Sequence, residues 1–389
     1  MLTGNSHHLT YCANIHPAES WEEALLQLKN HIPKIKQVVS PESKFGVGLY
    51  LSDKASREIL VGSHLNKFKS WLNKEGLYVF TMNGFPYGGF HGNVVKDNVY
   101  KPDWTTRERM EYTKRLFNIL ASLVPDGIDG GVSTLPISYK YWFDSKSKAE
   151  KARDDSCKHF VEIALFLKEI ESRTGKHLHL DIEPEPDCFI ENSDEVIEFF
   201  MRLSKAGNET VLKRHIAVCY DICHFSVKYE EPESVFQKLI SNGIRIGKIQ
   251  ISAALKATFS SENSDKQQIV NQFKQFNEAR YLHQTGVRSD SNEYTSFRDL
   301  SFAIEFFNQN VREWRTHFHV PLFIEKYGSL LSTQDDVLKV LHFLRKNHIT
   351  NHLEVETYSW DVLPANFKAD MTNSIIRELE WVKKNLRAE

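Results

Sequence analysis

The sequence has little of three features that would each define its class: paired cysteines, long apolar runs and charge of one sign. Its five cysteines include no CxxC pair, which excludes a disulfide framework and a cysteine-based structural zinc site. No apolar run approaches the roughly 20 residues of a membrane span, and the first residues do not resemble a secretory signal. We therefore expect a cytoplasmic protein without a membrane span.

The charge balance limits the kinds of partner. The chain has 49 Lys and Arg against 51 Asp and Glu, so its net charge is -2 and no global positive field is available to neutralise phosphates. A nucleic-acid partner is therefore not expected. A hydrophobic fraction of 41% with 25 Phe excludes a disordered chain. The length of 389 residues fits two or three domains or one elaborated α/β barrel.

Short strand-like segments alternate along the chain with longer segments of helical periodicity. In one of the longer segments, for example, apolar residues recur at Phe160, Ile163, Leu167 and Ile170. Strands are predicted at eight places: 9–15, 45–51, 77–83, 130–135, 177–183, 214–221, 244–252 and 352–358. Eight strands that alternate with helices predict an α/β fold of the (β/α)8 TIM-barrel type.

One segment is too long for an ordinary connection between a strand and a helix. It covers about 253–330, between the last two predicted strands, and contains the polar run SSENSDKQQ. Because such barrels place their sites at the C-terminal face, we expect a loop insertion there. No Pro-rich or Ser-rich linker divides the chain, so a single domain over 1–389 is predicted.

Four of the predicted strands alternate polar with apolar side chains. In a closed barrel the apolar set faces the covering helices, which sends five carboxylates inward: Asp181, Glu183, Asp221, Glu354 and Glu356. Lys248 is the evident cation among them. Buried carboxylates repel one another and lose hydration at a cost of several kcal/mol each, which predicts a divalent cation at the barrel mouth. An antiparallel sheet with one wet face is the alternative, since it alternates in the same way.

Histidines add further candidate ligands. His224 follows Asp221 by three residues in YDICHF, so its imidazole can return from the loop toward the same ion or substrate. In HFHVP, His317 and His319 point the same way if the segment is extended, and two imidazoles on one side can hold a zinc-like ion. The alternative for HFHVP is a surface turn. His283, in RYLHQT, is a further candidate for contact with an ion or substrate.

A glycine-rich loop, NGFPYGGFHG over 83–92, follows the third predicted strand. It has neither the lysine of a P-loop nor the spacing of a dinucleotide fingerprint, so it does not indicate a nucleotide phosphate. Phe85 and Tyr87 offer apolar surface, and we expect the loop to form a lid or wall that contacts the substrate. Among the inward polar residues, Lys248 is predicted to bind the substrate.

Four motifs at the predicted strand ends carry a family resemblance. They are IEPEPD with Glu183, YDICH with Asp221 and His224, KIQIS with Gln250, and LEVETY with Glu356. They resemble the metal-binding strand ends of the xylose-isomerase-like barrel superfamily, which includes sugar epimerases and endonuclease-IV-type repair enzymes. The resemblance implies that the carboxylates and Gln250 hold a divalent metal and that His224 contacts substrate oxygen.

The position of Gln250 departs from the pattern of that superfamily. Its sugar isomerases commonly have a histidine ligand where this chain has the amide of Gln250. A neutral amide binds a soft metal less well than an imidazole does, which favours Mn or Mg over Zn at this position.

A more specific resemblance extends over nearly the whole chain. It rests on the stretches LTYCANIHPAESW, NGFPYGGFHG, STLPISYK, YDICHFSV, GKIQISAAL, YLHQ, HFHVPLF and LEVETYSWDVLP. These are similar to the EboE family, the metabolite traffic proteins of a bacterial operon. The resemblance implies a cytoplasmic step in a metabolite biosynthesis or export pathway, with other proteins of the same operon as partners. It implies no particular reaction.

Three functions remain open at this point, all with a small-molecule substrate. The first is a metal-dependent isomerase or epimerase, in which Glu183 or Glu356 moves an α-proton. The second is a metal-dependent phosphoester hydrolase that resembles endonuclease IV and holds two or three ions. In that case four histidines join the carboxylates: His224, His283, His317 and His319. The third is a metabolite-binding protein without turnover.

Overall fold

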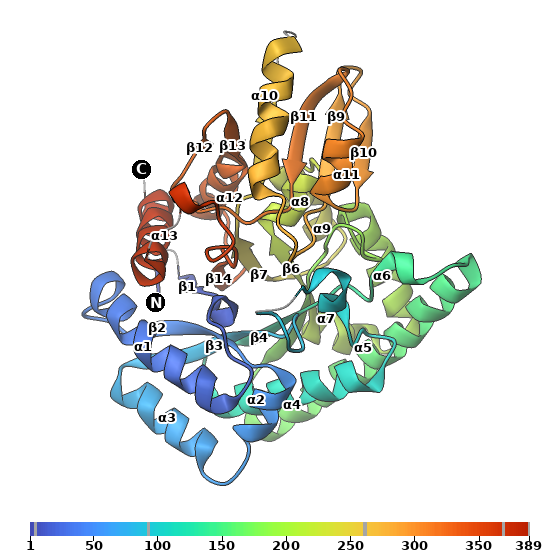
Figure 1. Cartoon of the computed structure of the whole chain (residues 1–389). Helices are drawn as coiled ribbons and strands as arrows, with labels where there is room; N and C mark the ends of the chain where they lie inside the picture. Colours follow the sequence, from blue (N-terminus) through green and yellow to red (C-terminus); the bar gives the residue numbers. More distant parts are fainter. Residues whose placement is uncertain (4–5, 92–93, 260–262, 368–369, 388–389) are drawn as a thin grey trace.

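The computed structural model describes residues 1–3, 6–91, 94–259, 263–367 and 370–387. Its centre is an eight-stranded parallel sheet in the order β1-β14-β7-β6-β5-β4-β3-β2. An isolated parallel bridge between Cys12 and Gly48 joins the end of β1 to β2, so the sheet is a nearly closed barrel (Figure 1). The barrel strands are β1 (His8–Tyr11), β2 (Phe45–Tyr50), β3 (Leu77–Asn83), β4 (Gly130–Thr134), β5 (Leu178–Ile182), β6 (Ile216–Asp221), β7 (Ile246–Ile251) and β14 (His352–Val355).

Helices connect the strands and surround the barrel, which confirms the predicted TIM-barrel fold (Figure 1). Serine and asparagine side chains cap several of them, as Ser20 does for the first helix. They are α1 (Trp21–Val39), α2 (Asp53–Glu58), α3 (His64–Lys74), α4 (Arg107–Leu123), α5 (Lys146–Thr174), α6 (Ser193–Ala206), α7 (Glu209–His215), α8 (Ile222–Val227), α9 (Pro232–Ser241), α12 (Gln334–Lys346) and α13 (Met371–Arg387).

The first predicted strand is too long. Strand β1 ends at Tyr11 rather than at residue 15, and a short 3-10 helix, Ala13–Ile15, follows it. The backbone N–H of His16 donates to the carbonyl of Ala13, which closes that turn and takes the chain out of the sheet. The side chains of this 3-10 helix are buried like those of the strand, so the apolar run in the sequence continues through the turn. Apolarity alone therefore does not mark the end of the strand.

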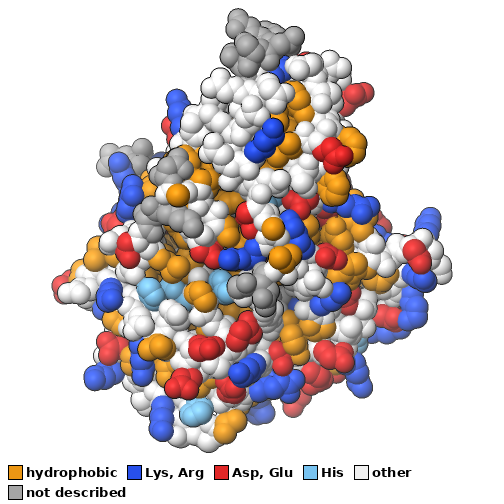
Figure 2. All heavy atoms as spheres, viewed as in Figure 1, with side chains coloured by type: hydrophobic (Ala, Val, Ile, Leu, Met, Phe, Trp, Pro, Cys, Tyr) orange, Lys and Arg blue, Asp and Glu red, His pale blue; other side chains and the backbone are white. Residues whose placement is uncertain are grey.

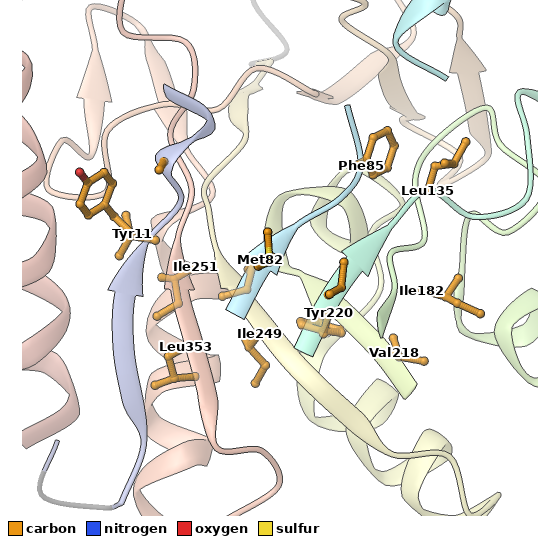
Figure 3. Packing of buried hydrophobic residues seen from close by; sticks show 14 of the residues in the cluster. Tyr11, Met82, Phe85, Leu135, Ile182, Val218, Tyr220, Ile249, Ile251 and Leu353 are labelled. Atoms are coloured by element: carbon orange, nitrogen blue, oxygen red, sulfur yellow. The ribbon is translucent and has the colours of Figure 1, made fainter. Parts of the chain in front are cut away.

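The alternation of side chains along the barrel strands follows the prediction. Ile182, Val218, Ile249 and Leu353 belong to one buried apolar cluster, which packs the strands against the helices (Figure 3). Along these strands, the polar residues that alternate with the apolar ones are also buried, as expected for side chains directed into the barrel. The alternative of an antiparallel sheet with one wet face is wrong, because every pairing in this sheet is parallel.

A second sheet lies between β7 and α12. It is antiparallel, in the order β10-β9-β11-β8-β13-β12, and projects from the barrel at the top of Figure 1. Its elements are β8 (Leu255–Thr258), α10 (Asn263–Phe273), β9 (Thr285–Ser289), β10 (Tyr294–Phe297), α11 (Leu300–Glu305), β11 (Val311–Thr316), β12 (Lys326–Tyr327) and β13 (Leu330–Ser332). The segment that we expect to be a loop insertion is thus largely sheet and helix. A single domain over 1–389 stays a prediction.

The surface carries charges of both signs. Figure 2 shows acidic and basic side chains interspersed over one face, in agreement with the net charge of -2. This face has no broad field of one sign. No helix within the described ranges combines the length and the apolar character that crossing a membrane requires.

Helix α13 carries a buried carboxyl group behind the last barrel strand. Glu378 is 1% exposed, and its Oε1 accepts hydrogen bonds from Thr357 Oγ1 at 2.7 Å and from the Leu322 backbone N–H at 3.1 Å. Burial raises the pKa of Glu378 to about 8, although these hydrogen bonds act in the opposite direction. The folded protein therefore holds a proton here at neutral pH, which the unfolded chain releases.

This proton predicts a pH-dependent stability. The stabilisation that the protonated carboxyl provides is complete below about pH 4.5 and is lost as the pH rises through about 8. We expect the free energy of unfolding of the wild type to fall by roughly 3–5 kcal/mol relative to Glu378→Gln between these two pH values. Urea denaturation at several pH values measures the difference. Parallel curves for the two proteins would mean that Glu378 ionises normally.

Candidate functional site

Three carboxylates meet at the C-terminal end of the barrel. Glu183 directly follows β5, Asp221 is the last residue of β6, and Glu356 directly follows β14. One oxygen atom from each lies within 4.8 Å of the other two, and all three side chains are buried. Strands that are far apart in the sequence thus bring together the three carboxylates that the superfamily resemblance assigns to a metal. We call them the carboxylate triad.

The triad is electrostatically costly as it stands. Burial, and then repulsion from Glu356 and Asp221, raises the pKa of Glu183 well above its usual range. Burial, and then Asp221, does the same to the pKa of Glu356. Glu183 Oε2 and Asp221 Oδ2 have no hydrogen-bond partner among the described residues. Buried carboxylates in this state are stabilised by a proton or a cation, so the donor set fits a divalent ion.

Neighbouring side chains hold the triad in place. Asn14 Nδ2 and Asn83 Nδ2 donate to Glu356 Oε1 at 2.7 Å and 3.1 Å. Ser252 Oγ and the His224 backbone N–H donate to Asp221 Oδ1 at 2.7 Å and 3.0 Å. Asp221 is the N-cap residue of α8, and the bond from the His224 N–H is its capping hydrogen bond. The two donors to each carboxylate share one of its two oxygens. The arrangement therefore orients the groups as the supporting residues of a metal site do.

Three histidines adjoin the triad with their Nε2 atoms available. The Nδ1 atoms of His224, His317 and His319 lie 2.8 Å from Pro184 O, Gln284 Oε1 and Glu356 O. These acceptors carry no proton, so each Nδ1 is the donor and each Nε2 can keep its lone pair.

The three imidazoles converge, and burial keeps two of them neutral. The Nε2 atoms of His224 and His317 are 3.2 Å apart, and His319 Nε2 has no partner among the described residues. Burial, and then His224, lowers the pKa of His317 well below its usual range, and burial lowers the pKa of His319 to about 4. Neutral imidazole is the form that binds metals. The surface-turn alternative for HFHVP is wrong, since both side chains are buried.

Together the carboxylates and imidazoles form overlapping groups of donors. Besides the triad, atoms within 4.8 Å of one another come from Asp221 with His224 and His319, and from Glu185 with His224 and His317. A third group combines Cys223 with His317 and His319. Oxygen donors suit Mg or Mn, and the mixed groups suit Zn. The site can therefore hold one ion at the triad or further ions beside it.

Among the residues missed in the sequence are two further candidate ligands. Glu185 lies two residues after Glu183 in IEPEPD, and its Oε1 accepts a hydrogen bond from Tyr100 Oη at 2.8 Å. Burial raises the pKa of Glu185 to about 7. Cys223 lies between Asp221 and His224 in YDICHF, and burial raises its pKa. Both were visible as neighbours of candidate residues, but they follow strand ends, where alternation no longer predicts direction.

An open cavity leads to the triad. The space between its atoms, counted out to the open mouth, is about 540 Å³. Aromatic side chains form much of its wall, with polar groups at one end. Lining residues are Asn14, Asn83, Phe85, Phe90, Lys96, Tyr100, Glu183, Glu185, His224, Tyr281, His317, His319, Glu356 and Tyr358. The loop over 83–92 thus supplies part of the wall, through Phe85 and Phe90, and its Gly92 lies outside the described residues.

Three residues predicted to bind substrate lie elsewhere. Lys248 is fully buried further down the barrel, where its Nζ is 2.7 Å from Glu354 Oε2, so it cannot contact a molecule in the cavity. Tyr87 packs against Tyr112 at 5.0 Å between ring centroids instead of lining the cavity. His283 does not line it either, and both of its ring nitrogens are hydrogen-bonded within the protein.

His283 and Gln250 lie beside the site, and polar atoms of both are engaged in hydrogen bonds. His283 Nε2 lies 2.7 Å from Glu278 Oε1, and its Nδ1 lies 2.9 Å from the carbonyl of His317. Gln250 stands beside Asp221 in strand register, but its Oε1 accepts a hydrogen bond from the Cys219 thiol at 3.0 Å. Gln250 is fully buried and does not line the cavity. Metal ligation by Gln250 therefore stays a prediction, with its oxygen already engaged.

Comparison with known proteins identifies the fold. No model of a protein family matches the sequence, and no curated protein matches it. A xylose isomerase-like TIM-barrel protein from Mycobacterium smegmatis, solved in complex with magnesium, is similar to 99% of this chain over 98% of its own, with 11% identity and a TM-score of 0.52. The fold is that of a xylose isomerase-like TIM barrel.

Two further solved structures have lower scores. The IOLI protein with a bound zinc atom covers 97% of this chain and 97% of its own, at 11% identity and a TM-score of 0.49. A probable 3-DHS dehydratase, AsbF from Bacillus anthracis, covers 96% of this chain and 97% of its own, at 11% identity and a TM-score of 0.47. At such identities the likeness concerns the fold alone. The EboE resemblance stays a prediction.

Proposed function

We propose that this xylose isomerase-like barrel is a metal-dependent enzyme that acts on a small metabolite, in the manner of a sugar isomerase or epimerase. The carboxylate triad of Glu183, Asp221 and Glu356 carries the proposal, since it combines buried oxygen donors without partners and a cavity that reaches two of them. The magnesium in the Mycobacterium smegmatis protein of the same fold supports a divalent ion here.

The residues around the cavity fit proton transfer on a small carbonyl compound. A divalent ion held by the triad would polarise a substrate carbonyl and its neighbouring hydroxyl. In this proposal Glu183 or Glu356, both of which line the cavity, accepts the α-proton. Glu185, with a pKa of about 7, adds a third carboxyl group that can exchange a proton there. The ring of Phe85 forms an apolar part of the cavity wall.

His224 has a separate role in this proposal. Its Nδ1 donates to the carbonyl of Pro184, so the ring orientation is set by the chain itself. Its Nε2 side lies at the cavity, where it can contact a substrate oxygen. The same atom faces His317 Nε2 at 3.2 Å, so substrate contact and metal ligation compete for it.

The histidines also favour a second candidate, a metal-dependent hydrolase of phosphoesters. Asp221 belongs both to the triad and to the group with His224 and His319, so two ions can lie side by side with a shared ligand. Paired ions activate water and stabilise a leaving phosphate oxygen. This candidate needs the mixed nitrogen and oxygen donors of HFHVP and YDICHF, which isomerisation at one ion does not.

The wider role follows from the EboE resemblance and belongs to the same proposal. We propose a step in metabolite biosynthesis or export in the cytoplasm, carried out together with other proteins of the same operon. A protein that binds the metabolite without turnover is the third candidate. If this third candidate is correct, the Glu183→Gln and Glu356→Gln variants keep both metabolite binding and cellular function.

Metal counting and metal removal test the proposal. We expect a chelator to abolish turnover of a panel of keto and aldo sugars, assayed by exchange of the α-hydrogen with solvent deuterium, and Mn²⁺ or Mg²⁺ to restore it. One ion per triad favours isomerisation, whereas two or three ions together with phosphoesterase activity favour hydrolysis. Full turnover after the ion has been removed would exclude the proposed mechanism.

A further inference from the structure

A second group of metal-binding side chains lies at the opposite, N-terminal end of the barrel. Asp129 precedes β4, His179 is the second residue of β5, and His352 is the first residue of β14. One candidate ligand atom from each lies within 4.8 Å of the other two. None of them lines the cavity of the carboxylate triad. The group therefore needs an explanation of its own.

The distances from the two histidines to the Asp129 carboxylate are long for hydrogen bonds. His179 Nε2 is 3.5 Å from Asp129 Oδ2, and His352 Nε2 is 3.4 Å from Asp129 Oδ1. Without an ion, His352 Nε2 is hydrogen-bonded at 3.2 Å to the backbone carbonyl of Asp129. A good N–H···O hydrogen bond is shorter, at about 2.9 Å. Ligands about 2.0–2.1 Å from a zinc ion at the tetrahedral angle stand about 3.3–3.4 Å apart. Each of the two separations is close to that value, one to Oδ2 and the other to Oδ1 of Asp129.

The His179 ring is oriented as a metal ligand is. Its Nδ1 lies 2.6 Å from Asp181 Oδ1, which leaves Nε2 as the atom directed at Asp129. His179 is 1% exposed, and its Nε2 has no hydrogen-bond partner among the described residues. A carboxylate that holds the far nitrogen of a histidine is the usual support of such ligands, because it sets the tautomer and the ring orientation.

The barrel makes room for this support. Two glycines lie beside the His179–Asp181 pair, Gly131 on β4 and Gly247 on β7. A Cβ at Gly131 would lie 2.5 Å from Asp181 Oδ2, and a Cβ at Gly247 would lie 2.8 Å from His179 Nδ1. Any larger residue would displace the paired side chains. Two strands thus lack side chains where the His179–Asp181 pair lies.

Asp129 completes the group from its open side. Its side chain is 21% exposed, so an ion can reach the site and a water molecule can complete the coordination. Asn351 Nδ2 donates to Asp129 Oδ1 at 2.9 Å, which holds the carboxylate toward the two imidazoles. Burial opposes ionisation, yet His179 and His352 hold the pKa of Asp129 below its usual range. The carboxylate is thus available as an anion.

We propose a second divalent-ion site of the zinc type, held by Asp129, His179 and His352 at the N-terminal end of the barrel. Two imidazoles and one carboxylate are a donor set that zinc accepts. The ion would join β14 to the adjacent strands β4 and β5, from which β7 and β6 separate it in the order of the sheet. Its role is to close this end of the barrel. The proposal does not depend on the reaction at the other end.

The test compares zinc binding in two matched variants of the full chain. Asp129→Asn keeps an acceptor for Asn351 but removes the anionic ligand, and Asp126→Asn changes a 97% exposed carboxylate three residues earlier. Equilibrium dialysis with Zn²⁺, in a Glu183→Gln/Glu356→Gln background, counts the ions outside the carboxylate triad. We expect Asp129→Asn to weaken the binding of one ion per chain by at least about 30-fold and Asp126→Asn to leave it unchanged.

Two further readouts keep the result decisive. Anomalous scattering at the zinc edge should place an ion between Asp129, His179 and His352 in the wild type. Zn²⁺ should also raise the melting temperature of the background protein, and Asp129→Asn, but not Asp126→Asn, should reduce that rise. Equal zinc affinity in both variants, or no anomalous peak at this end, would overturn the proposal. The three side chains would then be an ion-pair network around a protonated His179.

Discussion

Replacing Glu183 by glutamine should stabilise the protein without metal and remove most of the stabilisation that a divalent ion gives. In the absence of an ion, Glu183 is buried beside Glu356 and Asp221, and its pKa is raised for that reason. A neutral amide of the same shape relieves the repulsion. We expect a gain of about 1–3 kcal/mol in a chelator, the size of the penalty that a buried unpaired polar group carries.

The sign reverses when the ion is added. Wild type gains about 2.7 kcal/mol when free Mn²⁺ or Mg²⁺ reaches 100 times its dissociation constant. Glu183→Gln loses a ligand and should bind at least about 100-fold more weakly, so it gains little. Thermal unfolding with chelator and with metal measures both effects. Glu22→Gln, an exposed position on α1, is the control and should change neither. A Glu183→Gln protein that is less stable than wild type in chelator would contradict the repulsion argument.

Removing Lys248 should destabilise the protein more than any change at the cavity. Lys248 and Glu354 are both fully buried, and their charged atoms are 2.7 Å apart. Burial disfavours the charged amine, but Glu354 raises the pKa of Lys248 above its usual range. Lys248→Met leaves Glu354 as a buried charge without a cation, and such changes cost about 3–5 kcal/mol.

A double replacement separates the ion pair from packing. Lys248→Met combined with Glu354→Gln removes both charges, so we expect it to recover most of the lost free energy of unfolding. Lys148→Met is the control, because Lys148 and Asp144 are 2.8 Å apart but 64% and 70% exposed, and such a pair contributes below about 1 kcal/mol. Urea denaturation of five proteins gives the values: wild type, the single variants Lys248→Met and Glu354→Gln, the double variant and the control. Costs that add in the double variant would show that the two groups do not interact.

Strand alternation is why the carboxylate triad was predictable. A period of two residues places Asp181 and Glu183 on one face of β5, and closure of the barrel makes that face the inner one. The same argument identifies Asp221 and Glu356 at the ends of their strands. Where the pattern and the fold class are both correct, the direction of a strand side chain follows from parity alone.

Depth within the barrel was not predictable in this way. Lys248 has the correct parity, but register pairs it with His352, four residues before Glu356. Register depends on how the strands are staggered, and no local pattern encodes that. The second sheet was missed for a similar reason, because β8 pairs with β11 more than 50 residues away. Its pairing partners carry no local signal.

Residues in irregular segments were also beyond prediction. Asn14 lies in a 3-10 helix and reaches Glu356 across 342 residues of chain. Tyr87 follows Phe85 by two positions, yet only Phe85 lines the cavity, because the loop does not continue the strand. Such positions depend on backbone turns that hydrophobic periodicity does not describe.

The site is assembled from two sheets that belong to different parts of the fold. His317 and His319 follow β11 of the second sheet, whereas the carboxylates follow barrel strands. An ion ligated from both sides would have to be released before β9 and β11 could open away from the barrel. Amide hydrogen exchange in these two strands should therefore slow when metal is added, with little change in the distant helix α5. Metal occupancy would then set how often the second sheet detaches.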